Sequence, residues 1–170
     1  TDTTLVELPP SATMGNQIFV RADTRGHRIV TVRPEAVDFA ARKSNIEIRL
    51  EGEESPPVVY GVANRLQQAI LNLVLNAIQA MPDGGVLRIT GERSDSSVIL
   101  RWVDSGVGMT EEVRQRAFEP FVTSQKDGTG LGLAVVYSAV EEHGGTVDIT
   151  STPGRGTAIT VELPTAAALP

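Results

Sequence analysis

A glycine-rich run lies directly before a segment in which apolar residues recur with helical spacing. The run consists of Gly128, Thr129, Gly130, Leu131, Gly132 and Leu133. Glycines before a helix leave backbone N–H groups without partners, and the N-terminus of the helix adds partial positive charge. The run therefore predicts a seat for an anion such as phosphate that needs no basic side chain. By itself it would also fit an ordinary turn, so its interpretation depends on other motifs.

The first such motif is a carboxylate followed by two glycines. Asp104 ends the alternating segment Ser97 to Val103, and Gly106 and Gly108 follow it. A carboxylate at the end of a strand can accept a hydrogen bond from an exocyclic amine, while glycines let a flat ring approach the backbone. Asp104 alone would fit a turn residue after a strand. The glycines favour a base-binding loop.

The second motif is a row of carboxamides on a predicted helix from about Ala63 to Met81. Asn72, Asn76 and Gln79 lie four and three residues apart, which puts them on one helix face. Carboxamide oxygens suit Mg²⁺, a metal usually held by few protein groups together with substrate phosphates. The alternative is that they are exposed residues of an amphipathic helix. Asparagine is a poor helix former, so two at one-turn spacing favour a function.

These three motifs, with the sequence Phe118-Glu119-Pro120-Phe121, resemble the catalytic ATP-binding domain of bacterial sensor histidine kinases. That domain belongs to a superfamily that includes DNA gyrase, heat-shock chaperone and mismatch-repair ATPases. The resemblance extends from about Glu35 to Leu163. It implies that Asn76 binds Mg²⁺, that Asn72 reaches the phosphates, and that Asp104 accepts the N6 amine of adenine.

The resemblance also implies further nucleotide contacts. Outside the glycine-rich run they are Gln79, Gly106, Gly108, Met109, Phe121, Thr123, Ser124, Lys126 and Thr157. Phe118 and Phe121 would flank a loop that covers ATP, and at least one of them is expected to anchor that loop to the core. Gln79 stands where relatives often have Lys or Arg, which weakens its phosphate contact. Gln125 stands where relatives often have a Lys, and the sequence leaves open whether Lys126 takes over that role.

The composition favours one soluble globular domain. The 170 residues suffice for one domain with a sizeable core, and the absence of cysteine excludes disulfides and cysteine-ligated metals. A net charge of −6 argues against a nucleic-acid partner. No apolar run approaches the roughly 20 residues of a membrane helix. We therefore expect that the chain does not itself span a membrane. Because it begins at Thr1 and not at Met, we interpret it as a fragment, and membrane attachment of the intact protein stays open.

The pattern of elements predicts an α/β two-layer sandwich, in which a mixed sheet of about five strands packs on about three helices. Helices are expected at about 29–43, 63–81, 110–116 and 133–143, and strands at about 17–22, 45–51, 58–60, 86–93, 97–104, 146–151 and 157–163. The predicted divisions are a lead-in with a possible edge strand (1–28), an ATP-binding catalytic domain (29–163) and a disordered tail (164–170).

The resemblance implies a cytoplasmic domain that binds ATP and Mg²⁺ and transfers the γ-phosphoryl group to a histidine on a separate dimerisation and phosphotransfer domain of the same protein. A response regulator would be the downstream partner. Neither His27 nor His143 lies in the family's acceptor motif, so this chain should bind ATP without phosphorylating itself. His143, just before Gly144, is interpreted as a helix-capping residue whose charge would favour the helix dipole.

Two alternatives come from other functional classes. One is a protein serine kinase of the anti-sigma-factor type, which shares the ATP-binding fold. The Phe118–Phe121 sequence and the glycine-rich run favour a histidine kinase over it. The other is a nucleotide-binding regulatory module without kinase activity, against which the intact Asn76 and Asp104 argue.

Overall fold

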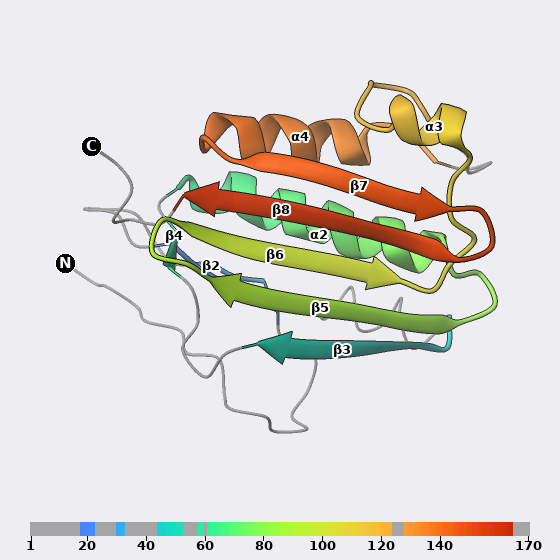
Figure 1. The fold of residues 1–170 in the computed structure, drawn as a ribbon, viewed down its shortest axis with the longest axis horizontal. Coiled ribbons are helices and arrows are strands. Elements are labelled where there is room, and N and C mark those ends of the chain that lie inside the picture. Colours follow the sequence, from blue (N-terminus) through green and yellow to red (C-terminus); the bar gives the residue numbers. More distant parts are fainter. Residues whose placement is uncertain are drawn as a thin grey trace.

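Two long helices lie on one face of a five-stranded sheet in this computed structural model (Figure 1). The structure describes residues 18–22, 30–32, 44–52, 58–59, 61–123 and 128–164. Most of the predicted lead-in, Ser124 and Lys126 of the covering loop, and residues 165–170 of the predicted tail lie outside the described residues. The two-layer α/β architecture predicted from the sequence is confirmed.

The large sheet has the strand order β3-β5-β6-β8-β7. Its strands are β3 (Ile46–Gly52), β5 (Gly85–Arg93), β6 (Ser97–Asp104), β7 (Thr146–Thr152) and β8 (Gly156–Pro164). β3 and β5 are parallel and the other pairs antiparallel, so the sheet is mixed as predicted. Pro164, assigned to the tail by the sequence, ends β8 opposite Ser97 instead, since the fixed φ of proline is compatible with extended backbone.

Three helices are present among the described residues: α2 (Ala63–Gln79), α3 (Glu111–Gln115) and α4 (Gly132–Glu142). Thr110 caps α3 as predicted, because its Oγ1 accepts a hydrogen bond from the N–H of Val113 at 3.4 Å. None of these helices is long and apolar enough to cross a membrane.

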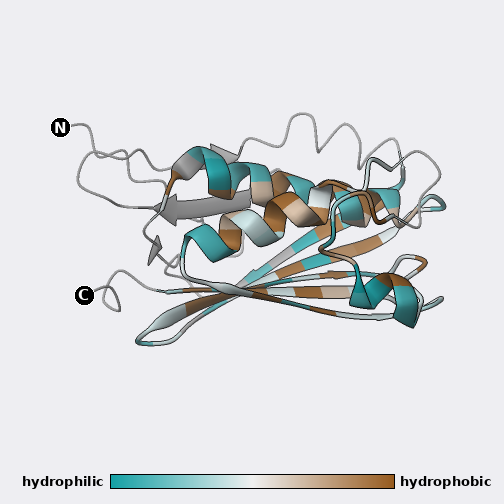
Figure 2. Ribbon diagram, turned by 90° about the horizontal axis from the view of Figure 1, so that it is seen from above, coloured by the Kyte–Doolittle hydropathy of each residue, from teal (hydrophilic) through white to brown (hydrophobic). Residues whose placement is uncertain are grey.

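The core lies between the helices and the sheet (Figure 2). Alternate strand residues face the helices, such as Leu87 on β5 and Trp102 on β6, whereas Arg88 and Arg101 lie exposed on the opposite face. α2 and α4 contribute the side chains that pack on this surface, among them Leu73, Val74, Val136 and Val140. This packing holds the ends of both helices in fixed positions relative to the ends of β6 and β8.

A second sheet, of order β2-β1-β4, was not predicted as such. Its strands are β1 (Ile18–Ala22), β2 (Val30–Val32) and β4 (Val58–Val59). The prediction of a helix over residues 29–43 was wrong at 30–32, where β2 pairs with β1. Three consecutive β-branched residues favour extended backbone, and Pro34 disfavours helical conformation at the residue before it. The rest of that predicted helix lies outside the described residues.

His143 is the C-cap residue of α4, as predicted, and its ring forms two hydrogen bonds. The N–H of Val62, the N-cap of α2, donates to Nε2 of His143 at 2.8 Å, and Nδ1 donates to the carbonyl of Ala139 at 2.5 Å. The ring therefore links the start of α2 to the end of α4.

Candidate functional site

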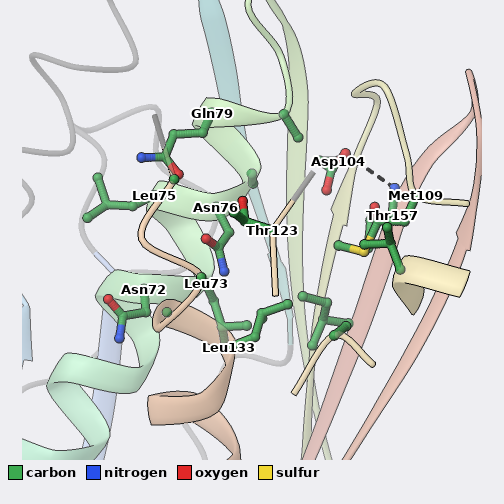
Figure 3. A pocket seen from close by; sticks show the side chains of 18 of the residues that line it. Asn72, Leu73, Leu75, Asn76, Gln79, Asp104, Met109, Thr123, Leu133 and Thr157 are labelled. Carbon is green, nitrogen blue, oxygen red and sulfur yellow. Dashed lines mark hydrogen bonds between the residues drawn. The ribbon is translucent and has the colours of Figure 1, made fainter. Parts of the chain in front are cut away.

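A cleft of about 250 Å³ lies between α2, the start of α4 and the ends of β6 and β8 (Figure 3). The predicted site residues that line it are Asn72, Asn76, Gln79, Asp104, Gly108, Met109, Thr123, Gly128, Thr129, Gly130, Gly132, Leu133 and Thr157. Residues from the three separate motifs of the sequence are thus brought to one cavity.

Of the predicted site residues that the structure describes, three do not line this cleft: Gly106, Phe121 and Leu131. Phe121 is 77% exposed, and its contribution is made by the backbone, whose N–H donates to the carbonyl of Gly130 at 2.9 Å. This bond joins the two ends of the predicted covering loop. The aromatic that anchors the loop to the core is Phe118, whose ring lies 5.5 Å from that of Tyr137.

Asp104 lies at the end of β6 with 8% of its surface exposed. Its Oδ1 accepts hydrogen bonds from the N–H groups of Gly106 at 2.9 Å and Thr157 at 3.2 Å. Within the described residues, Oδ2 accepts no hydrogen bond. Burial raises the pKa of this carboxyl group and outweighs the two backbone N–H groups, which lower it. Among the described residues, Nε1 of Trp102 is the only buried side-chain polar atom without a partner, so Oδ2 of Asp104 is accessible. It provides an acceptor for a ligand that carries an N–H or O–H group.

The glycines after Asp104 fit the loop against the protein itself. A side chain at Gly106 would collide with the carbonyl of Ala80 at the end of α2, and one at Gly108 with the carbonyl of Thr152. Gly108 also has a φ of 67°, a conformation that favours glycine. Gly106 therefore allows close packing of the loop on α2, whereas Gly108 both packs on β7 and lines the cleft. The approach of a flat ring, which the sequence suggested, stays a prediction.

The N-terminus of α4 forms another wall of the cleft. The N–H groups of Gly132, Leu133 and Ala134 have no acceptor within the described residues, since the first helical bond runs from Val135 to Leu131. The N-cap residue provides no side-chain acceptor, and the first turn contains no acidic residue. Free N–H groups and the positive end of the helix dipole face the cleft here, which is the arrangement expected of an anion seat.

Asn76 on α2 lies against this helix start. A Cβ atom added at Gly132 would lie 3.2 Å from Oδ1 and 3.4 Å from Nδ2 of Asn76. Figure 3 shows the Asn76 side chain between Thr123 and Leu133, with Asn72 one turn away along α2. Among the described residues, the Asn76 carboxamide forms no hydrogen bond and no group of His, Cys, Asp or Glu could hold a metal ion. A cation in this cleft would therefore be held by carboxamide oxygens and by the ligand itself.

The residues that sequence reasoning missed include Trp102, which lines the cleft, and Ser151, which lies behind its wall. Trp102 faces the helices two residues before Asp104 and lines the cleft with 3% of its surface exposed. Ser151 on β7 does not line the cleft, but hydrogen-bonds to Met109 and Thr157, which do. Strand alternation could have placed Trp102 on the side of Asp104. The predicted pairing of strands 146–151 and 157–163 already places Ser151 opposite Thr157, as the structure confirms, but nothing in the sequence places Met109 beside them.

Residues 61–167 match the sequence profile of the family described as "Histidine kinase-, DNA gyrase B-, and HSP90-like ATPase". The chain is 40% identical over 130 residues to the sensor histidine kinase ZraS of Escherichia coli K12, covering 76% of this chain and 28% of that protein. It is 38% identical over 130 residues to sporulation kinase B of Bacillus subtilis, covering 75% and 30%. The chain thus spans less than a third of the length of these relatives.

Solved structures of similar fold include the catalytic domain of the histidine kinase ThkA, in a nucleotide-free form. It has 31% identity and a TM-score of 0.70, and the match covers 78% of this chain and 87% of that one. Full-length ShkA in complex with AMPPNP has 33% identity and a TM-score of 0.68, with 79% of this chain and 29% of that chain covered. At 33% and 31% identity, both structures resemble this chain in sequence as well as in fold.

Proposed function

Because this chain belongs to the family of histidine kinase-, DNA gyrase B- and HSP90-like ATPases, and resembles in particular the catalytic domains of histidine kinases, we propose that it binds ATP with Mg²⁺ in the cleft and transfers the γ-phosphoryl group to a histidine. The observation that carries the proposal is the pairing, in one cleft, of the buried Asp104 carboxylate with the bare N-terminus of α4. The Asp104 end of the cleft suits a base, and the end at the N-terminus of α4 suits phosphates.

The adenine base is assigned to the Asp104 end of the cleft. The exocyclic N6 amine of adenine donates to Oδ2 of Asp104, which has no partner within the described residues. Guanine presents a carbonyl oxygen at this position and would leave the buried carboxylate facing a second acceptor. A site built to bond an N–H group rejects an analogue without it strongly, because the buried group is left unpaired.

The phosphates are assigned to the N-terminus of α4, where three backbone N–H groups have no acceptor in the part of the chain that the structure describes. Asn76 would hold Mg²⁺ through its carboxamide oxygen and Asn72 would contact the phosphates, since both line the cleft without side-chain hydrogen bonds among the described residues. When bound, the metal neutralises charge on the transferred phosphoryl group. Asn76 thereby orients the phosphates, and the N–H groups of α4 bind their charge.

The acceptor is proposed to be a histidine on a separate dimerisation domain of the same protein, and a response regulator the next partner. ATP is abundant in the cytoplasm, so we place the domain there. His143 is excluded as acceptor because both of its ring nitrogens are already hydrogen-bonded. The names of the relatives favour this function over a serine kinase.

Phosphoryl transfer in trans tests the proposal. The chain should transfer radiolabelled phosphate from ATP to a separately supplied acceptor domain of the intact protein, and should not label itself. Labelling of serine on the acceptor, or of this chain alone, would contradict the histidine kinase assignment.

A further inference from the structure

Ser151 on β7 connects two walls of the cleft although it does not line the cleft itself. Its Oγ accepts a hydrogen bond from the N–H of Met109 at 2.8 Å. It also lies 3.0 Å from the carbonyl oxygen of Gly156 and 2.8 Å from Oγ1 of Thr157. Met109 and Thr157 lie side by side next to Asp104 in Figure 3.

A serine hydroxyl has one hydrogen to donate, so these contacts allow two arrangements. In one, Ser151 donates to the carbonyl of Gly156 and Thr157 donates its hydrogen to Ser151. In the other, Ser151 donates to Oγ1 of Thr157, and the hydrogen of Thr157 becomes free to point into the cleft. Thr157 is 5% exposed and lines the cleft, so the choice between the two arrangements decides whether its hydroxyl hydrogen is available to a ligand.

The base selects between them. Thr157 is the immediate neighbour of Asp104, because its N–H donates to Oδ1 of that residue at 3.2 Å. In adenine, the two ring nitrogens nearest to the N6 amine, N1 and N7, are both acceptors. With the amine on Asp104, a direct contact of the Thr157 hydroxyl with one of these nitrogens requires the hydroxyl to donate.

We propose that Ser151 is a positioning residue for the base. In the nucleotide complex, the N–H of Met109 donates to Ser151, Ser151 donates to Thr157, and Thr157 donates to a ring nitrogen of adenine. Hydrogen bonds in such a chain polarise one another and strengthen the last one. This inference rests on the proposed function, since it takes the ligand to be an adenine nucleotide.

Analogues of ADP that lack one ring nitrogen test this directly by calorimetric titration with Mg²⁺. In 1-deaza-ADP and 7-deaza-ADP, a C–H group replaces N1 and N7 respectively. Ser151→Ala should weaken ADP binding about three- to tenfold, the usual worth of one hydrogen bond. Ser151→Ala and wild type should bind the analogue that lacks the nitrogen facing Thr157 with the same affinity. Ser151→Thr keeps the hydroxyl and should bind nearly as wild type.

Two further variants separate the relay from a general effect on the fold. Thr150→Ala removes a hydroxyl from the adjacent, exposed position of β7 and should leave every affinity unchanged. Thr157→Val removes the last donor, so adding Ser151→Ala to it should cause no additional loss. If Ser151→Ala melts below the assay temperature, the affinities of Thr157→Val for ADP and for the two analogues test the relay instead.

Equal losses with ADP and both analogues, or no loss with ADP, would overturn the relay. So would a further loss in the double variant. If wild type bound GDP as tightly as ADP, the proposed function would fail and the inference with it. If wild type preferred ADP to GDP but Ser151→Ala lost the same affinity for ADP and for both analogues, the relay would be wrong and the proposed function would stand.

Discussion

The two oxygens of Asp104 have different surroundings, and this separates a folding role from a binding role. Oδ1 accepts the N–H groups of Gly106 and Thr157, whereas Oδ2 has no partner among the described residues. In Asp104→Asn, the carboxamide oxygen can keep the two backbone bonds, but an NH₂ group replaces the acceptor facing the base. Calorimetry should show ATP binding weakened by about 1–3 kcal/mol or more. Unchanged affinity would remove Asp104 from the base site.

Asp104→Asn should weaken ATP binding but should stabilise the folded protein. Burial raises the pKa of Asp104 in the folded protein, so the folded state binds a proton more readily than the unfolded state. Stability is then lost as the pH rises from the unfolded pKa through the raised folded pKa. Asp104→Asn should be more stable than wild type at pH 7, and the difference should shrink on acidification. Urea denaturation at several pH values measures this, and an advantage that grows as the pH falls would contradict it.

Asn76 should matter for chemistry more than for folding. Asn76→Ala should leave the melting temperature near that of wild type or slightly above it, because alanine is the better helix former and the carboxamide forms no hydrogen bond within the described residues. It should abolish phosphoryl transfer to a separate acceptor domain, since the phosphates lose their metal-held orientation. Asn72→Ala, one turn earlier, is the matched comparison and should harm transfer less. Wild-type transfer by Asn76→Ala would return this residue to a structural role.

At the scale of elements, the cleft depends on how α2 and α4 are held together. Two links join the start of α2 to the end of α4: the hydrogen bond from Val62 to His143, and the ion pair between Arg65 and Glu142 at 2.8 Å. The ion pair is about half exposed, with side-chain exposures of 50% and 42%. Exposed pairs contribute about 0–1 kcal/mol, so the histidine should be the more important link.

Substitution of the two links should therefore give unequal effects. His143→Ala removes the acceptor of the α2 N-cap and the donor to Ala139, and should lower the free energy of unfolding by about 1–3 kcal/mol. Glu142→Gln should lower it by less than about 1 kcal/mol. Urea unfolding curves of both variants decide the order. A larger loss in Glu142→Gln would show that the ion pair, and not the ring, joins the helices.

The elements around the site were predicted well from the sequence because their apolar periodicity is strong. α2 and the hairpin of β5 and β6 have the predicted positions within about two residues. β2 was missed because a short β-branched segment carries no reliable period, and its partner β1 lies elsewhere in the chain. Ser151 was missed because its role depends on the position of Met109, which the predicted pairing of residues 146–151 with 157–163 does not fix.

At the scale of the whole molecule, the fold brings together motifs that are distant in sequence. Parallel pairing of β3 with β5 requires a crossover, which α2 provides. α2 is thereby packed across the sheet, with Asn76 opposite the end of β6 and the start of α4. The glycines identified as ligand-facing in the sequence divide in the structure, because Gly106 packs on α2 while Gly132 gives room to Asn76. Residue type suggested the candidates, and packing decides which of them line the cleft.

Titration with ATP and GTP, with and without Mg²⁺, tests the central claim most directly. Trp102 is the single tryptophan of the chain and lines the cleft, so its fluorescence reports binding at this location beside the calorimetric heat. We expect saturable ATP binding that is weakened by removal of Mg²⁺, accompanied by a change in Trp102 emission, and GTP binding at least about tenfold weaker because Asp104 is left unpaired. Equal affinity for ATP and GTP, or ATP binding without any response from Trp102, would contradict an adenine nucleotide site in this cleft.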